Sequence, residues 1–300
     1  MMITNKNGIP EIIVLAIEGN LYQGAKEERF ASATSILKPN KIFVLQKRYD
    51  KELSEEASSM IWSLMGSAMH SVLERAIKRI ENFIKHRKII CEASLLTKID
   101  GEIIIGHPDL YESGVISDYK FTSVWSYIYE SGFRDYESQL NIYALMFRQE
   151  SFKVNRVQNI FIFRDWSANK AKFEHGYPDS QVKVKVHPLW TEEFTINFLA
   201  KRIKSLKESL ELTDDEIPFC SQEERWQDDT KFAVKKKGLK KASKICKTFE
   251  EASNWIIDQG LNAKKYTMEK RVGIPRRCID YCNVNKFCNF YKEYMEKQNG

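Results

Sequence analysis

Long hydrophobic runs are missing from this 300-residue chain. The nearest candidate, residues 12–17, is far shorter than the roughly 20 apolar residues that a membrane-spanning helix needs. The first residues also lack the charged and apolar segments of a secretory signal. No internal repeat and no low-complexity linker interrupts the sequence. We therefore expect a cytoplasmic globular protein.

The composition is that of an ordinary folded protein, with 43% hydrophobic and 29% charged residues. The net charge of +6 is small for the length, so the distribution of charge matters more than its sum. Six cysteines in a chain without a secretory signal indicate a reducing compartment, where clustered thiols serve a metal.

The hydrophobic pattern predicts an α/β fold with a mixed central sheet flanked by helices. We expect a lead-in over residues 1–55 that packs on the core, a core over 56–212 and a lysine-rich C-terminal extension over 213–300. The predicted helices and strands are helices over 65–84, 136–148 and 191–212, and strands over 89–97, 102–111, 115–121, 157–163 and 181–187. Asp100-Gly101 is a favourable hairpin turn, and the valines at 182, 184 and 186 suggest a half-buried strand.

Two carboxylates and a lysine fall on neighbouring predicted strands. Asp109 follows an apolar run, and Asp118 and Lys120 are two residues apart, so their side chains point to the same sheet face. Such charges are costly to bury unless they serve a metal or a reaction. The alternative is a partly exposed edge hairpin with a surface salt bridge.

Flanking helices carry further candidates for the same site. His70 on the first helix is either a metal ligand or a histidine hydrogen-bonded at the edge of the core, and Glu92 is a weaker supporting candidate. Gln139 and Tyr143 are four residues apart and suit a phosphate or a stacked base near the metal. The alternative for Tyr143 is packing on the sheet.

Taken together, these residues resemble the PD-(D/E)XK nuclease superfamily, in its RecB-like and Cas4-like exonuclease branch. The resemblance rests on His70, Gly106-x-x-Asp109, Asp118-Tyr119-Lys120 and Gln139-x-x-x-Tyr143 in the family's order. It covers roughly residues 30–290, and the lead-in and tail are similar to phage and prophage members. A phage-encoded protein would work in the host cytoplasm.

The resemblance implies a restriction-endonuclease-like core and a metal-dependent DNA exonuclease. His70, Asp109 and Asp118 would bind Mg²⁺ or Mn²⁺, with the Tyr119 carbonyl as a further ligand. Lys120 would position or activate the attacking water, and nearby burial can lower its pKa for work as a base. Gln139 and Tyr143 would orient Lys120 and the DNA backbone.

The tail holds Cys278-x3-Cys282-x5-Cys288, three thiols that need a fourth ligand to close a metal site. We select Cys220 as that ligand, because Cys91 and Cys246 fit better as small buried apolar residues. In the resembling nucleases such a triplet, with one upstream cysteine, holds a [4Fe–4S] cluster that joins the tail to the core. This sequence departs from the Cas4-like arrangement, because no cysteine precedes the core. Zinc is the competing interpretation.

A lysine run completes the C-terminal region, with no acidic residue between its members: Lys231, Lys235, Lys236, Lys237, Lys240, Lys241, Lys244 and Lys247. It is either a solvated face or a basic hairpin that grips DNA phosphates, and we select Lys235, Lys236 and Lys237 as DNA contacts.

Two other functions stay open beside the exonuclease. One is a non-catalytic module that binds DNA ends; the other is a subunit of a helicase–nuclease or CRISPR adaptation complex. No Gly-Lys-Thr phosphate loop is present, so any helicase would be a separate chain.

Overall fold

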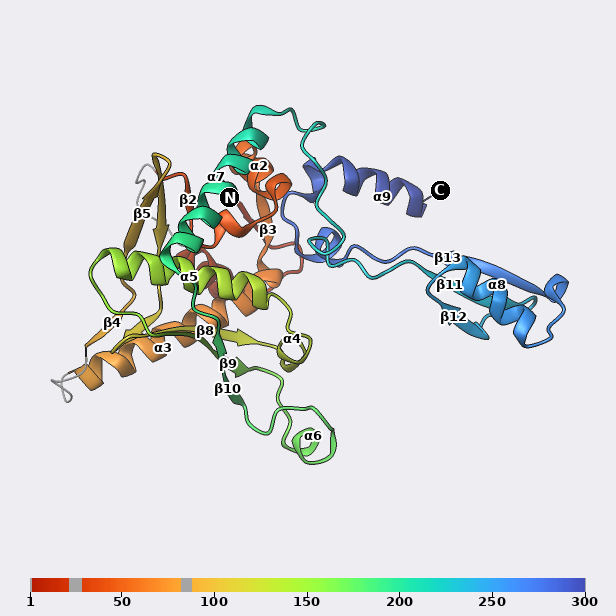
Figure 1. Cartoon of the computed structure of the whole chain (residues 1–300), viewed down its shortest axis with the longest axis horizontal. Helices are drawn as coiled ribbons and strands as arrows, with labels where there is room; N and C mark the ends of the chain where they lie inside the picture. The colour runs from red at the N-terminus through yellow and green to blue at the C-terminus, as the bar shows by residue number, and fades with distance from the viewer. Residues whose placement is uncertain (1, 22–28, 82–87, 300) are drawn as a thin grey trace. The chain divides into compact units, whose positions relative to one another are not determined.

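The computed structural model describes residues 2–21, 29–81 and 88–299 of the chain (Figure 1). Contacts divide the chain into two compact units. Unit 1 comprises residues 1–38 and 49–211, and unit 2 comprises residues 39–48 and 212–300. Both units combine helices with strands, so the expected mixed α/β class is confirmed. Within the described ranges, none of the helices is both long and apolar enough to cross a membrane.

The main sheet of unit 1 is mixed, as the sequence predicts. Its strand order is β10 (Val182–His187), β9 (Arg156–Phe163), β8 (Val115–Thr122), β7 (Leu110–Glu112) and β4 (Ile89–Cys91). β8 and β9 run parallel, and the other neighbours pair antiparallel. Since β8 is central, consecutive residues on both of its faces are buried, including Ser117 and Asp118.

Helices α3 (Ile61–Glu81) and α5 (Phe133–Gln149) contact opposite faces of β8 (Figure 1). Adjacent strand residues point to opposite faces. The Tyr119 ring lies against His70 of α3, whereas Lys120 bonds Gln139 of α5. α3 confirms the predicted helix as far as Glu81; the rest of the range, to residue 84, lies outside the described residues. Helix α7 (Glu192–Glu211) contacts α5.

A smaller sheet holds β2 (Ala31–Ser32), β6 (Glu102–Gly106) and β5 (Leu95–Ile99). The predicted hairpin turn is confirmed, because β5 and β6 pair antiparallel around Asp100 and Gly101. Both turn residues have positive φ, which a tight two-residue hairpin turn requires.

The strands predicted over 89–97 and 102–111 are wrong in extent, since each is two strands. Glu92, with a φ of +51°, ends β4. Pro108, which lacks an N–H, separates β6 from β7. These breaks let the chain leave the smaller sheet after Gly106 and enter the main sheet at Leu110, so Asp109 lies in the link between the two sheets.

The strand predicted over 181–187 is present as β10, but the expected burial of its valines is wrong. Val182, Val184 and Val186 are 46–53% exposed. The opposite face of this edge strand is the covered one, because Lys185 lies over the Phe133 ring of α5, 5.4 Å from its centroid.

Unit 2 contains the lysine run as a hairpin of β11 (Lys231–Lys236) and β12 (Lys244–Cys246), with β13 (Tyr266–Arg271) on the other side of β11. Helix α8 (Phe249–Asp258) packs on this sheet and buries Val234, Cys246 and Ile256 in one apolar cluster. Thr248 caps α8 by accepting a hydrogen bond from the backbone N–H of Glu251.

The remaining elements are short or peripheral: β1 (Met2–Thr4), α1 (Glu11–Asn20), η1 (Ser35–Leu37), α2 (Asn40–Arg48), η2 (Asp50–Glu52), β3 (Ser54–Glu56), η3 (Ala57–Met60), α4 (Val124–Ile128), α6 (Ala168–Phe173), η4 (Ala263–Lys265), η5 (Arg277–Tyr281), η6 (Asn285–Phe287) and α9 (Asn289–Asn299). Of these, only α2, η5 and η6 contribute to a site described below.

Candidate functional site

Asp109 joins three elements of unit 1. It lies in the link between β6 and β7, and its side chain is buried. Oδ2 accepts a hydrogen bond from the backbone N–H of Tyr119 at 2.7 Å. Oδ1 lies 3.4 Å from Nδ1 of His70 on α3. The predicted residues His70 and Asp109 are therefore neighbours in the structure.

Glu92 completes a group that could hold a metal ion. One ligand atom from each of His70, Glu92 and Asp109 lies within 4.8 Å of the other two. The hydrogen bond to Asp109 raises the pKa of His70 above its ordinary value. Burial, reinforced by the charge of Asp109, raises the pKa of Glu92. A divalent cation at this point would favour the ionised carboxylates and relieve the repulsion between them.

Asp118 and Lys120 form a buried ion pair on one face of β8, as their spacing predicts. The distance from Nζ of Lys120 to Oδ2 of Asp118 is 2.5 Å. Burial raises the pKa of Asp118 despite the nearby lysine. Burial alone would lower the pKa of Lys120, but the attraction of Asp118 outweighs it and the net shift is upward. The net shift therefore does not favour Lys120 as a base in this arrangement.

Gln139 and Tyr143 reach Lys120 from α5. Nζ of Lys120 donates to Oε1 of Gln139 at 3.3 Å, and Nε2 of Gln139 donates to the hydroxyl oxygen of Tyr143 at 2.8 Å. Both side chains are buried, so the structure places them behind the lysine rather than at the surface. The ring of Tyr136 adds a further contact, 4.7 Å from Nζ of Lys120. Gln139 and Tyr143 were expected to orient both Lys120 and the DNA backbone. This geometry favours the orientation of Lys120.

The resemblance predicts the Tyr119 carbonyl as a metal ligand, whereas the N–H and the ring of Tyr119 make the contacts described here. Its N–H bonds Asp109, and its ring meets the His70 ring edge-on with centroids 6.0 Å apart. Burial raises the pKa of the Tyr119 hydroxyl. Tyr119 thus links the His70–Glu92–Asp109 group to the strand that carries Asp118 and Lys120.

Sequence reasoning missed Asn159 and His187. Asn159 of β9 pairs in register with Asp118 and donates to its Oδ2 at 2.9 Å. His187 of β10 lies 2.8 Å from Oδ1 of Asn159. The signal in the sequence was the pair of polar residues Gln158 and Asn159 inside the otherwise apolar run 157–163. Asn159 has no evident partner until the order of the strands is known.

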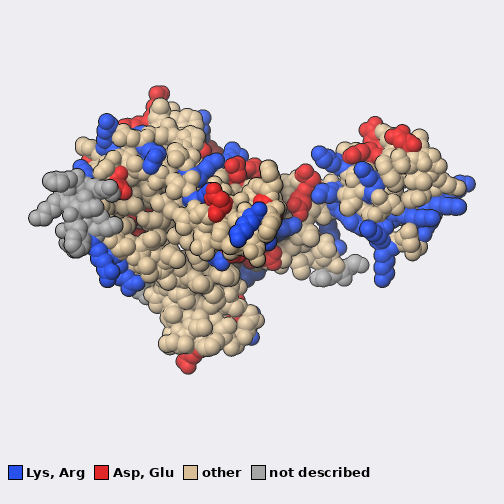
Figure 2. All heavy atoms as spheres, turned by 90° about the horizontal axis from the view of Figure 1, so that it is seen from below, with Lys and Arg blue, Asp and Glu red and all other residues tan. Residues whose placement is uncertain are grey.

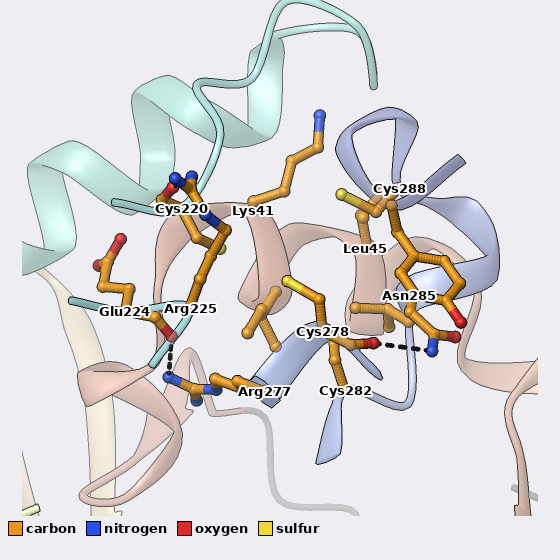
Figure 3. Close-up of a pocket in the computed structure, with 13 residues that line it drawn as sticks. Lys41, Leu45, Cys220, Glu224, Arg225, Arg277, Cys278, Cys282, Asn285 and Cys288 are labelled. Atoms are coloured by element: carbon orange, nitrogen blue, oxygen red, sulfur yellow. Dashed lines mark hydrogen bonds between the residues drawn. The ribbon is translucent and has the colours of Figure 1, made fainter. Parts of the chain in front are cut away.

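In unit 2, the four cysteines predicted to share a metal line one cavity (Figure 3). Cys278 lies in η5, Cys282 follows it, Cys288 follows η6, and Cys220 comes from the segment after α7. Burial raises the pKa of Cys220 to about 12 and that of Cys278 to about 11. Nδ2 of Asn285 donates to the carbonyl oxygen of Cys278 at 2.9 Å, which holds the loop between them.

Positive side chains surround these thiols. Lys41 of α2 lines the cavity and donates from Nζ to the carbonyl oxygen of Ile217 at 3.2 Å, just before Cys220. Arg225 donates to the carbonyl oxygen of Cys220, and Arg277 also lines the cavity. The charges of Arg225 and Arg277 oppose the effect of burial on the pKa of Cys278 and favour the thiolate form that a metal would bind.

The spacing of the thiols is wider than that of the carboxylate–histidine group. In the described part of the chain, His70, Glu92 and Asp109 form the group whose ligand atoms all lie within 4.8 Å of one another, and no trio of these cysteines does. The two other cysteines lie elsewhere. Cys246 is buried in the apolar cluster of α8, as expected, whereas Cys91 of β4 is only half-buried.

The lysine run forms one side of the module that β11, β12, β13 and α8 make. Figure 2 shows lysines and arginines along one side of this module and acidic residues on the opposite side. Lys236 and Lys237 are exposed. Lys235 is instead half-buried and forms an ion pair with Glu269 of β13. Of the three selected lysines, two are therefore presented to solvent.

A scan against protein-family models and a search of curated proteins give no match to this chain. Among solved structures, one described as the crystal structure of SSO0001 is similar at a TM-score of 0.43 and 18% sequence identity. The match covers 67% of this chain and 87% of the other.

Proposed function

We propose that the protein is a divalent-metal-dependent DNA exonuclease with a restriction-endonuclease-like core. One observation carries the proposal. Asp109 of the His70–Glu92–Asp109 group bonds the N–H of Tyr119, the residue between Asp118 and Lys120, and the charges of Asp109 and His70 both act on the pKa of Asp118. Asp109 and Asp118 are buried, and buried charges destabilise a fold unless they serve a metal or a reaction.

Oxygen-rich sites with one imidazole suit Mg²⁺ or Mn²⁺. In this proposal Asp109, Asp118 and His70 hold the ion, and Glu92 supports it. A bound ion of this kind polarises a phosphodiester and lowers the pKa of a water molecule. The residues of the chain orient that ion and exclude bulk water from its buried side.

Lys120 contacts the scissile phosphate in this proposal. Since Asp118 keeps its ammonium group protonated, we assign it the stabilisation of negative charge rather than the removal of a proton. Gln139 and Tyr143 hold the lysine in place through the two hydrogen bonds described above.

We assign a [4Fe–4S] cluster to Cys220, Cys278, Cys282 and Cys288. Around a single zinc ion, with bonds of about 2.3 Å, tetrahedral thiolates lie about 3.8 Å apart. Each thiolate of a cubane cluster binds a different iron, so the sulfurs stay further apart. The wider spacing of these cysteines supports the cluster over zinc. Anaerobic purification should give a brown protein absorbing near ~400 nm; a colourless protein with stoichiometric zinc would contradict the assignment.

The exposed lysines of the β11–β12 hairpin are proposed to bind DNA phosphates without regard to sequence. This surface belongs to unit 2, so DNA binding and cleavage can be separated by mutation. The biological setting we favour is the processing of DNA ends in recombination, repair or phage DNA metabolism, with any helicase supplied by a separate chain.

The decisive experiment incubates the purified protein with end-labelled linear DNA and with closed circular DNA, each with Mn²⁺, with Mg²⁺ and with a chelator. We expect metal-dependent loss of linear DNA only. Asp118→Ala and Lys120→Ala should abolish cleavage while the circular dichroism spectrum is kept.

Each of the other outcomes would indicate a different function or refute the site. Cleavage of closed circles would indicate an endonuclease. Binding of DNA ends without cleavage under any metal would favour the non-catalytic module. Full activity in the Asp118→Ala, Lys120→Ala double variant would refute the site.

A further inference from the structure

A chain of buried polar side chains crosses the main sheet of unit 1 beside Asp118. Nε2 of His187 in β10 lies 2.8 Å from Oδ1 of Asn159 in β9, and Nδ2 of Asn159 lies 2.9 Å from Oδ2 of Asp118 in β8. His187, Asn159 and Asp118 are 6%, 0% and 3% exposed. Apolar side chains would fill such positions at lower free-energy cost, so this chain of contacts calls for a role.

The direction of each hydrogen bond follows from the chemistry of Asn159. Its amide nitrogen faces two acceptors of Asp118, namely Oδ2 and the backbone carbonyl oxygen at 3.3 Å. The carbonyl oxygen of the same amide can only accept, so Nε2 of His187 must carry a proton and donate to it. Burial lowers the pKa of His187, which agrees with a neutral ring. The direction of donation therefore runs from His187 to Asn159 to Asp118.

This arrangement fixes the rotation of the Asp118 carboxylate. Nζ of Lys120 also contacts Oδ2, at 2.5 Å. The lysine and the amide thus converge on one oxygen, and among the described residues both side-chain donors to Asp118 use it. Oδ1 is the oxygen turned away from these donors.

We propose that Asn159 and His187 are positioning residues of the metal centre, which hold Asp118 so that Oδ1 faces the ion. The inference rests on the proposed function, because it takes Asp118 as a metal ligand. Partners of this kind orient ligands and typically account for a 10- to 100-fold difference in metal affinity.

The same strands offer a matched control. Gln158 and Ser117 immediately precede Asn159 and Asp118, and their side chains point to the opposite face. Nε2 of Gln158 donates to Oγ of Ser117 at 2.9 Å, and both residues are buried. Replacing Gln158 therefore removes a comparable buried hydrogen bond between the same two strands without touching Asp118.

The test measures Mn²⁺ affinity by isothermal titration calorimetry, with thermal unfolding of each variant in parallel. Asn159→Ala should weaken binding by about 10- to 100-fold. Asn159→Asp keeps the side-chain volume but replaces the donor with an acceptor, so it should weaken binding at least as much. Gln158→Ala should stay within about twofold of the unchanged protein, because that pair lies outside the proposed chain.

His187 is tested by a pair of variants. His187→Leu removes the donor to Asn159 and should weaken Mn²⁺ binding. His187→Gln places an amide donor at a similar reach and should restore most of the affinity.

The outcomes separate this inference from the proposed function. Normal Mn²⁺ affinity in both Asn159 variants would overturn the positioning role and leave the nuclease proposal intact. Equal losses of Mn²⁺ affinity in Gln158→Ala and Asn159→Ala would show that the hydrogen bonds of Asn159 are only structural. That result would also overturn the positioning role. Equal losses of Mn²⁺ affinity in His187→Gln and His187→Leu would exclude His187 from the positioning role. An unchanged protein that neither binds Mn²⁺ nor cleaves DNA would defeat the proposed function, and the inference with it.

Discussion

Gly106 is the last residue of β6 and lies against α5. We predict that adding one methyl group at this position, as in Gly106→Ala, indirectly displaces Lys120. A Cβ at this position would lie 2.7 Å from Sδ of Met146 and 2.8 Å from Cε1 of Tyr143. Both contacts are shorter than carbon atoms tolerate, so the neighbours must move. Met146 and Tyr143 are buried, and the Tyr143 ring is rigid and bonded to Gln139.

The size of the effect follows from these contacts. Inserting one extra carbon into a close-packed core typically destabilises it by about 1–3 kcal/mol. For a unit of this length that is a fall in Tm of roughly 2–12 °C. The change should also reach the site, because the hydroxyl of Tyr143 holds Gln139 and Gln139 holds Lys120. We therefore expect cleavage to fall by more than the unfolded fraction explains.

The assay is urea unfolding of Gly106→Ala, with hydrogen exchange of α5 peptides to report on unit 1. Gly66→Ala is the matched control, since Gly66 lies inside α3 and a Cβ there meets nothing within 4 Å. Replacing a helical glycine with alanine stabilises by about 0.5–1 kcal/mol. The same chemical change should thus have opposite signs at the two positions. A Gly106→Ala protein as stable and as active as the unchanged one would refute this reasoning.

Three further predictions concern the other sites. Cys220→Ser should lose the ~400 nm absorbance and bound iron of the proposed cluster, whereas Cys246→Ala should keep both; iron retained by Cys220→Ser would exclude that residue as a ligand. Replacing Lys236 and Lys237 by glutamine should reduce the salt dependence of DNA binding by up to about two in the logarithmic slope. Glutamine at Lys201 and Lys204 of α7 is the control, and an equal change there would argue against the hairpin. The pKa of His187 is lowered by burial, so below the unfolded value of about 6.5 the unfolded chain binds more protons. The stability contribution of a neutral His187 should be present above pH 6.5 and be lost as pH falls through its folded pKa; unfolding measured from pH 8 to 5 should show this loss, and His187→Gln should remove it.

Much of the candidate centre could be predicted because its residues lie close together in the sequence. Asp118 and Lys120 are two residues apart on a strand, and period-two geometry alone puts them on one face. Gln139 and Tyr143 are one helical turn apart, which similarly places them together. The spacing of Cys278, Cys282 and Cys288 likewise indicated a shared occupant before any fold was known.

The parts that failed depend on which segments become neighbours. The role of Asn159 could not be assigned until β9 was known to lie beside β8. The exposure of Val184 follows from β10 lying at the edge of the sheet with its lysine face toward α5. The ion pair of Lys235 could not be foreseen either, because β13 brings Glu269 next to it from 34 positions away. The alternation of apolar and polar residues within one strand does not show which other strands lie beside it.

The assembly of unit 2 shows the same dependence on distant segments. α2 comes from residues 40–48, yet it groups with residues 212–300. Lys41 bonds the carbonyl oxygen of Ile217, and Nε2 of Gln46 donates to Oδ1 of Asn283 at 2.8 Å. These contacts cannot form until nearly the whole chain has been made. Because Lys41 and Leu45 line the cavity of the four cysteines, a metal bound there would stabilise α2 together with the tail. A chain cut after residue 212 would therefore lose the partners of α2 along with the thiols, so that boundary does not separate an intact core from a dispensable extension.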